Sequence, residues 1–177
     1  VLVYPGFEAD DAVGSIANLY KNDYKVNIYS IDKDLAQLVE DNVTLVRKIK
    51  KKNEQGRFVT YNIDDVKNEF GVHPKKIPDL LALMGDTADN LPGLDGIGPV
   101  KAAKIIEEYI SVDHLLACVE QVQNKGLKNQ IREYKDLLPL VKTLTTIKCD
   151  LPIESAFLEA CDLSSNIRGN LNYHDNF

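Results

Sequence analysis

Acidic side chains gather at three points along this chain of 177 residues, and each point is a predicted turn between elements. The three groups are Glu8, Asp10 and Asp11 at the start of an expected helix, Asp32 and Asp34 after an expected strand, and Asp86 and Asp89 before a loop rich in Pro and Gly. Taken singly, each group has an ordinary interpretation, because acids commonly cap helices and fill polar turns.

Taken together, the groups predict a metal site. In an α/β sheet the strand ends and helix starts meet at one edge, and residues two apart at a strand exit, such as Asp32 and Asp34, point to the same side. Seven converging carboxylates would raise one another's pKa unless cations neutralised them. Oxygen ligands select Mg²⁺ or Mn²⁺, and a pair of such ions roughly 4 Å apart typically acts on phosphodiesters. Zinc is disfavoured, since His73, His114 and His174 stand alone in the sequence.

The segment between residues 90 and 99 is a second, more specific pattern. Its glycines, Gly93, Gly96 and Gly98, predict a hairpin between two helices, with Ile97 as the buried plug and Pro99 at the first position of the second helix. Backbone amides at such a helix start can bind a phosphate oxygen. The order is neither a dinucleotide fingerprint nor a Walker loop. A helix connection without any ligand remains the alternative.

Around these sites the patterns predict an alternating α/β first third followed by helices. The expected strands span 25–31, 43–49 and 58–61, and the expected helices span 7–20, 35–39, 64–70, 79–84, 100–109, 112–122 and 127–145, the last interrupted before Pro139. We expect an α/β core over 1–84, a helical region that contains the glycine hairpin over 85–150, and a poorly specified tail over 151–177.

Composition excludes several classes of protein. The 27 Asp and Glu exceed the 21 Lys and Arg, and a net charge of -6 counts at first against a nucleic-acid partner. Three scattered cysteines indicate reduced thiols in an intracellular compartment, and no apolar run is long enough to span a membrane. The densest basic run, Arg47, Lys48 and Lys50 to Lys52, suits a solvated hairpin better than a DNA-contacting strip.

Several ordered runs resemble the 5′-nuclease, or flap endonuclease, family, especially the 5′-3′ exonuclease domain of bacterial DNA polymerase I and its free-standing relatives. These runs are PGFEADD at 5–11, SIDKD at 30–34 with QLV at 37–39, FGVHP at 70–74, LMGDTADNLPG at 83–93, GIGP at 96–99 and DLPIE at 150–154. The resemblance implies a PIN-like mixed sheet flanked by helices, followed by a helix-hairpin-helix element. Residues 1–84 would then be a partial α/β nuclease core, and residues 85–150 a helical DNA-binding region.

It also implies a two-metal hydrolase acting on 5′ ends and flaps of branched DNA and on RNA primers. Glu8 and Asp10 would hold one Mg²⁺ or Mn²⁺ ion, and Asp32, Asp34 and Asp89 the other. Asp11 and Asp86 would ligate through water or complete the charge shell. A non-catalytic branched-DNA-binding module and a related metal-dependent RNase are the alternatives.

In the same family the hairpin at Gly93, Gly96, Ile97 and Gly98 would grip duplex DNA, with a K⁺ ion held by carbonyls. Relatives usually carry a basic residue directly after the position of Pro99, whereas this chain has Val100, so Lys101 and Lys104 are the expected phosphate partners. The resemblance further implies a monomer that is fused to, or cooperates with, a DNA polymerase, in the cytoplasm (nucleoid) or in a DNA-containing organelle.

The start of the sequence departs from the family pattern. The family's fold begins with a strand that bears a metal-ligating Asp, followed by a basic helical arch, and the chain runs from Val1 directly into Pro5 and Gly6. We therefore expect an incomplete fragment without the N-terminal part of the fold, weakly active or inactive by itself. With two bound divalent ions the net charge becomes -6 + 4 = -2, so the acidity fits a metal site.

Overall fold

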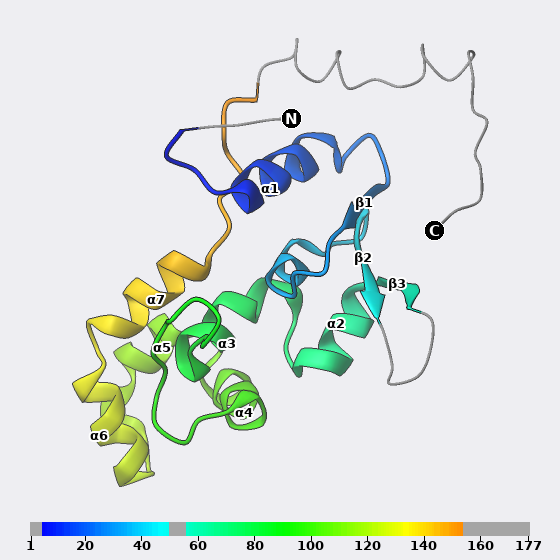
Figure 1. Ribbon diagram of the computed structural model, residues 1–177. Helices are drawn as coiled ribbons and strands as arrows, with labels where there is room; N and C mark the ends of the chain where they lie inside the picture. The colour runs from blue at the N-terminus through cyan, green and yellow to red at the C-terminus, as the bar shows by residue number, and fades with distance from the viewer. Residues whose placement is uncertain (1–4, 50–55, 154–177) are drawn as a thin grey trace, which may run out of the picture.

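The computed structural model describes residues 5–49 and 56–153. It consists of an α/β part and a helical part, joined through α3 (Figure 1). In chain order the elements, with η for a 3-10 helix, are α1 (Ala9–Tyr20), β1 (Val26–Tyr29), η1 (Asp34–Leu38), β2 (Val43–Ile49), β3 (Arg57–Tyr61), α2 (Ile63–Phe70), η2 (Pro74–Lys76), α3 (Ile77–Met84), α4 (Pro99–Tyr109), α5 (Val112–Ala117), η3 (Val119–Gln121), α6 (Lys125–Glu133) and α7 (Leu137–Thr145).

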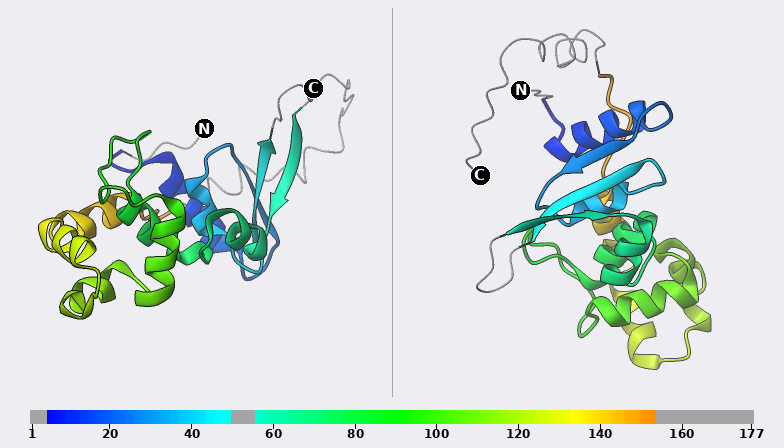
Figure 2. Two further views of the ribbon diagram at one scale, coloured as in Figure 1. Left: turned by 90° about the horizontal axis from the view of Figure 1, so that it is seen from below. Right: turned by 90° about the vertical axis from the view of Figure 1, so that its right-hand side faces the viewer.

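The sheet has three strands in the order β1-β2-β3 and is mixed, as predicted. β1 runs parallel to β2, with Val26 opposite Val43, and β3 pairs antiparallel with β2. α1 contacts β1, and the strands stand to one side of the clustered helices (Figure 2). Parallel pairing of β1 with β2 requires a crossover, and η1 lies within it. The end of β1 and the turn into η1 thus face the start of α1.

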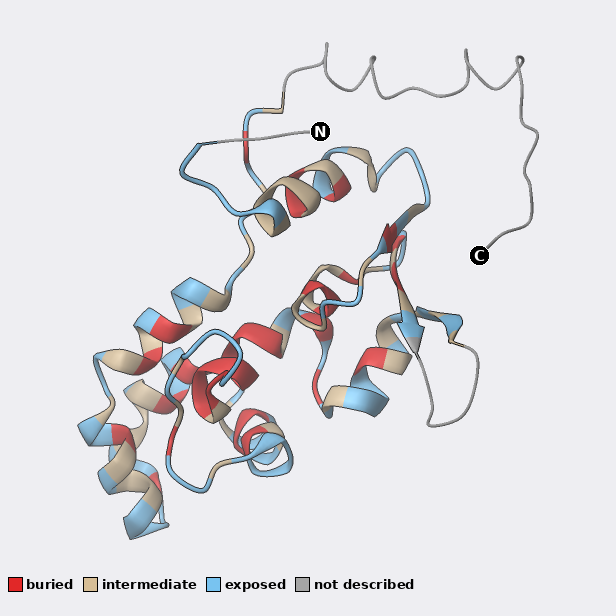
Figure 3. Ribbon diagram, viewed as in Figure 1, coloured by how far each residue is buried: buried red, intermediate tan, exposed pale blue. Residues whose placement is uncertain are grey.

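α3 is the centre of the helical part. Its residues Ile77 to Leu83 are all buried, and the helix packs against α4, α5 and α7 (Figure 3). A buried hydrogen bond and an ion pair add to this apolar packing. The buried Asp79 accepts a hydrogen bond from the Val112 amide at 2.9 Å and pairs with Lys142 of α7 at 2.8 Å. Because a buried carboxylate must be paired, this contact fixes α7 on α3.

Most predicted elements form within a few residues of their expected bounds, and two differ. The helix expected over 112–122 ends at Ala117, and a single turn, η3, follows it. The strand expected over 25–31 ends at Tyr29, since the Ser30 hydroxyl accepts the Asp32 amide at 3.0 Å and starts a turn. The predicted interruption before Pro139 is confirmed. Pro139 stands in the first turn of α7, where amides need no helical partner.

The basic run of the second strand is only partly described. Arg47 pairs with Glu69 at 2.8 Å and lies 5.3 Å from the centre of the Tyr61 ring, while Lys48 lies over Phe58. Lys50 to Lys52 lie outside the described residues. None of the helices in the described part of the chain has the length and apolarity that crossing a bilayer requires.

After α7 the chain turns back toward α1. We call residues 146–151 the strap; Figure 1 shows this segment running from α7 to α1. The strap packs so closely that a Cβ at Gly14 of α1 would lie 2.8 Å from Ile147 Cγ2 and 2.9 Å from Cys149 Sγ. The absence of a side chain at Gly14 therefore lets the strap join the helical part to the first helix.

Candidate metal centre and nucleic-acid interface

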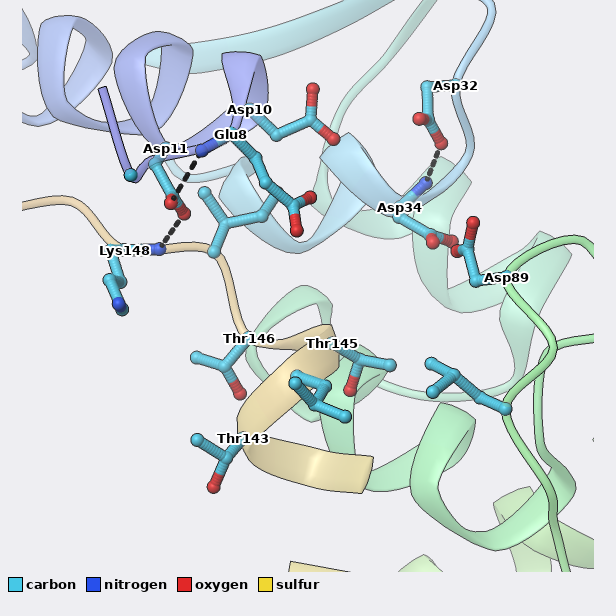
Figure 4. Close-up of a pocket in the computed structure, with 14 residues that line it drawn as sticks. Glu8, Asp10, Asp11, Asp32, Asp34, Asp89, Thr143, Thr145, Thr146 and Lys148 are labelled. Atoms are coloured by element: carbon cyan, nitrogen blue, oxygen red, sulfur yellow. Dashed lines mark hydrogen bonds between the residues drawn. The ribbon is translucent and has the colours of Figure 1, made fainter. Parts of the chain in front are cut away.

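One cleft of 580 Å³ collects the predicted acids (Figure 4). It is lined by Gly6, Glu8, Asp10, Asp11, Asp32, Asp34, Asp89, Leu91 and the segment 143–148. Six of the seven predicted carboxylates thus face the same space. The seventh, Asp86, is buried just behind it and is 4% exposed.

The start of α1 presents the first group of acids. Asp11 is occupied by backbone donors: its Oδ2 accepts the Glu8 amide at 3.3 Å, and its Oδ1 accepts the Lys148 amide at 2.8 Å. This leaves the side chains of Glu8 and Asp10 directed into the cleft (Figure 4). Acids also suit a helix N-terminus electrostatically, and the contact of Asp11 with the Glu8 amide confirms the capping interpretation. The metal-ligand interpretation of Glu8 and Asp10 stays a prediction.

Asp32 and Asp34 come together for a different reason from the one predicted. They lie beyond the end of β1, in the connection to η1 and at the first residue of η1, rather than at alternate positions of a strand. The Asp32 carboxylate accepts the Asp34 amide at 2.9 Å, and this turn sets the two side chains beside each other.

Asp86 and Asp89 enter from the loop after α3. Asp86 accepts a hydrogen bond from Lys33 Nζ at 2.7 Å and from the Ala88 amide at 2.8 Å. These two donors hold the loop so that one carboxylate oxygen each of Asp34, Asp86 and Asp89 lies within 4.8 Å of the other two.

The pKa shifts follow from this crowding. Burial, and then the charges of Asp32, Asp86 and Asp89, raise the pKa of Asp34 to about 6, although Lys33 opposes the shift. Burial, Asp32 and Glu8 likewise raise the pKa of Asp10. Burial also acts to raise the pKa of Asp86, but the hydrogen bonds from Lys33 and the Ala88 amide outweigh it, and the pKa is lowered. Burial and neighbouring charges therefore disfavour the ionised form of Asp34, whereas hydrogen bonds stabilise the ionised form of Asp86.

The donor set fits a hard divalent cation. Asp34 Oδ1 is buried and has no hydrogen-bond partner in the described part of the chain. Buried polar atoms are almost always satisfied, so an unsatisfied carboxylate oxygen beside two other carboxylates indicates a cation position. All the candidate ligands are oxygens, which suits Mg²⁺ or Mn²⁺.

The sequence did not predict two features, the lysine that pairs with Asp86 and one wall of the cleft. Lys33 lies between the two predicted ligands Asp32 and Asp34, and its place in the SIDKD run could have suggested a charge partner. The opposite wall, which includes Thr145 and Lys148, comes from the end of α7 and the strap. No local pattern points to that wall, because more than 100 residues separate it from α1.

The glycine hairpin connects α3 to α4, as predicted. A Cβ at Gly93 would lie 2.2 Å from the Met84 carbonyl carbon, so Gly93 serves the close packing of the hairpin on α3. Gly96 has a φ of +69°, and an added Cβ there would meet no atom within 4 Å. Leu94 is the buried plug at 3% exposure, whereas the predicted plug, Ile97, is half-buried. The Leu94 amide bonds the Leu83 carbonyl at 2.9 Å, which draws Leu94 inward.

The outer side of the hairpin is open to solvent. Gly98 forms the N-cap of α4, and Lys101 and Lys104 are exposed on that helix. Lys101 Nζ donates a hydrogen bond to the Gly96 carbonyl at 2.8 Å, so one of the two expected phosphate partners contacts the hairpin itself.

The mixed sheet, the acid-lined cleft and the glycine hairpin are the features that the resemblance to 5′ nucleases implies, and comparison with known proteins shows the family. The chain belongs to the 5′-3′ exonuclease family. The family model for the 5′-3′ exonuclease N-terminal resolvase-like domain matches residues 1–71, and the model for the C-terminal SAM fold matches residues 72–166.

Relatives in sequence carry the same two names that the resemblance suggested. The chain is 39% identical to DNA polymerase I of Bacillus subtilis over 149 residues, which cover 84% of the chain and 17% of the polymerase. It is 36% identical to the 5′-3′ exonuclease of Aquifex aeolicus over 165 residues, which cover 93% of the chain and 55% of the exonuclease. The chain thus spans about half the length of this exonuclease and a small part of the polymerase.

A solved structure of T5 5′-exonuclease with bound divalent zinc ions has the same fold. It aligns with a TM-score of 0.70 at 25% identity, covering 81% of this chain and 51% of the T5 protein. The α/β nuclease fold is therefore confirmed. The expectation that the N-terminal part of the fold is absent gains no support, because the N-terminal family model matches from residue 1. Whether the chain is weakly active or inactive by itself stays a prediction.

Proposed function

We propose that the chain is a divalent-metal-dependent 5′ nuclease that hydrolyses phosphodiester bonds at 5′ ends and flaps of branched DNA, including RNA primers. The observation that carries this proposal is the buried, unpartnered Oδ1 of Asp34 beside Asp86 and Asp89. A divalent cation is the partner that would satisfy this atom and lower the repulsion among the acids. Membership of the 5′-3′ exonuclease family supports the type of reaction.

The carboxylates divide into ligands and supports. Asp32, Asp34 and Asp89 would hold one Mg²⁺ or Mn²⁺ ion, and Glu8 and Asp10 the other. Asp86 holds Lys33 and the Ala88 amide, and Asp11 holds the Glu8 and Lys148 amides, so these two acids act mainly as supports. When bound, the ions would activate water and stabilise the charge that develops on the phosphate.

The hairpin would hold the duplex portion of the substrate. Gly96, Ile97 and Gly98 offer exposed backbone, and Lys101 and Lys104 offer charge to phosphates, which positions DNA without reading its sequence. A K⁺ ion at the hairpin would compete with Lys101 for the Gly96 carbonyl. We also propose a monomer that works with a DNA polymerase inside a DNA-containing compartment.

The Asp34→Asn variant tests this function. The amide keeps the shape of the side chain but removes the ligand charge, so we expect cleavage of a 5′-flap DNA with Mg²⁺ to fall on the order of 10³-fold or more, with DNA binding retained. The matched control is Asp23→Asn, at an exposed turn after α1, and it should cleave like the parent chain.

The same assay separates the alternatives. A binding module would bind the flap DNA without any Mg²⁺-dependent cleavage by the parent chain. A ribonuclease would cleave the matching RNA and spare the DNA. Equal cleavage by the parent and Asp34→Asn chains would contradict the proposal, because Asp34 and its unpartnered Oδ1 would then have no role in catalysis.

A further inference from the structure

The wall of the cleft opposite Asp34 and Asp89 carries a positive charge that the metal-site argument does not use. Lys148, on the strap, lines the cleft and is exposed, and Figure 4 places it across the cleft from those two acids. Within the described ranges no carboxylate lies at ion-pair distance from its ammonium group. Its neighbour is the Phe7 ring, 5.3 Å from Lys148 Nζ to the ring centre. The Phe7 ring thus contacts the ammonium group of Lys148, and no described carboxylate neutralises its charge.

The strap that carries Lys148 is held by side chains from distant parts of the chain. Gln37 of η1 uses both ends of its amide: Nε2 donates to the Thr145 carbonyl at 2.9 Å, and Oε1 accepts the Ile147 amide at 3.0 Å. Asp11 accepts the Lys148 amide itself at 2.8 Å. Such paired contacts from a single amide fix the direction of a backbone segment as well as its position.

Further contacts extend the attachment along α1. Ser15 Oγ accepts the Leu151 amide at 3.0 Å, and Asn18 Nδ2 donates to the Cys149 carbonyl at 3.1 Å. With the close packing at Gly14, these contacts hold the strap on the helix that has Glu8 as its N-cap and Asp10 in its first turn. The position of Lys148 is therefore coupled to the position of the acids.

We propose that Lys148 binds a phosphate of the nucleic-acid strand that enters the cleft, and that Gln37 is a positioning residue that holds Lys148 in place through the strap. This inference rests on the proposed function, because it assumes a phosphodiester substrate. The neighbouring hydroxyls suit the role less well: Thr143, Thr145 and Thr146 already donate to carbonyls of α7. Lys148 remains the cationic donor of that wall.

The test measures equilibrium binding of a fluorescent 5′-flap DNA in Ca²⁺ over a series of KCl concentrations. Lys148→Ala should weaken binding about three- to tenfold and reduce the slope of log Kd against log salt by about 0.7 to 0.9, as expected for the loss of one phosphate contact. Lys148→Arg should restore both values. The control Lys25→Ala, at the other end of β1, removes an equal charge away from the cleft and should leave the slope unchanged.

Gln37→Met tests the positioning role, because it keeps the length of the side chain and loses both hydrogen bonds. It should raise the KM for cleavage several-fold with kcat within about twofold, and adding Lys148→Ala to it should cost little more, since coupled residues are non-additive. Strictly additive effects, or an unchanged salt slope in Lys148→Ala, would overturn the proposal. The binding arm is independent of cleavage, so a parent chain without nuclease activity would contradict the proposed function and leave the role of Lys148 to be decided by the slope.

Discussion

The loop between α3 and α4 serves two regions that contrast in how their polar groups are satisfied. At its start, Asp86 and Asp89 join Asp34 in a crowded carboxylate group with an unpartnered buried oxygen. At its end, the glycine hairpin is closed by backbone hydrogen bonds and by Lys101. The carboxylates therefore converge against their mutual repulsion, whereas the hairpin is held by hydrogen bonds within the chain.

The largest expected effect concerns the packing of the hairpin. Gly93→Ala would place a Cβ within 2.2 to 2.5 Å of the Met84 and Gly85 backbone. Backbone atoms cannot move aside as a flexible side chain can, so we expect a loss of about 3 kcal/mol or more in the free energy of unfolding, measured by urea denaturation.

Gly98→Ala is the matched control for this change. Gly98 has an ordinary φ of -91°, and a Cβ there would meet nothing within 4 Å. It should cost less than about 0.5 kcal/mol. Equal losses in the two variants would mean that the hairpin is not clamped on α3, and the contrast with the carboxylate group would fail.

Lys33 should be the main stabiliser of the metal-free carboxylate region. Lys33→Met would leave the buried Asp86 without its charged partner, and breaking a buried pair costs about 3 to 5 kcal/mol when both members are buried. Because the Lys33 side chain is 41% exposed, we expect a smaller loss, about 2 kcal/mol in the free energy of unfolding. Thermal denaturation measures this loss as a lower Tm. Lys67→Met, which breaks the exposed pair with Asp64, should shift Tm by less than a quarter as much.

The sequence predicted more of the chemistry than of the geometry. The acids were identified because their types and turns form a recurrent pattern, and the hairpin because glycine and proline mark backbone that few other residues can adopt. The wall containing Lys148 was not predictable, because only the packing of α7 and the strap brings it to the cleft. The pairing of Asp86 with Lys33 was not predictable either, since burial and side-chain hydrogen bonds are properties of the folded chain.

Protons should compete with the metal at Asp34. Its pKa is raised to about 6, so a proton must leave as Mg²⁺ binds in mildly acidic solution. Below that value we expect the apparent affinity to fall about tenfold per pH unit, measured by isothermal titration between about pH 5 and about pH 7.5. Without added Mg²⁺, protonated Asp34 stabilises the folded protein, because its pKa is higher in the folded state than in the unfolded state. This stabilisation is complete below the unfolded-state pKa and is lost as pH rises through about 6. An affinity independent of pH over this range would contradict the assignment of Asp34 as a ligand.

The smallest expected effect is a gain of stability from losing that ligand. Near neutral pH, Asp34→Asn removes a half-buried charge that Asp32, Asp86 and Asp89 repel, and we expect the metal-free protein to be stabilised by about 1 kcal/mol, since water screens part of the repulsion. Mg²⁺ should raise the Tm of the parent chain and leave that of the variant nearly unchanged, because binding only to the folded state stabilises it. Asp23→Asn should behave like the parent in both conditions. A destabilised Asp34→Asn chain would show that the carboxylate group is held by attractive contacts rather than strained, which would reverse the contrast between the two ends of the loop.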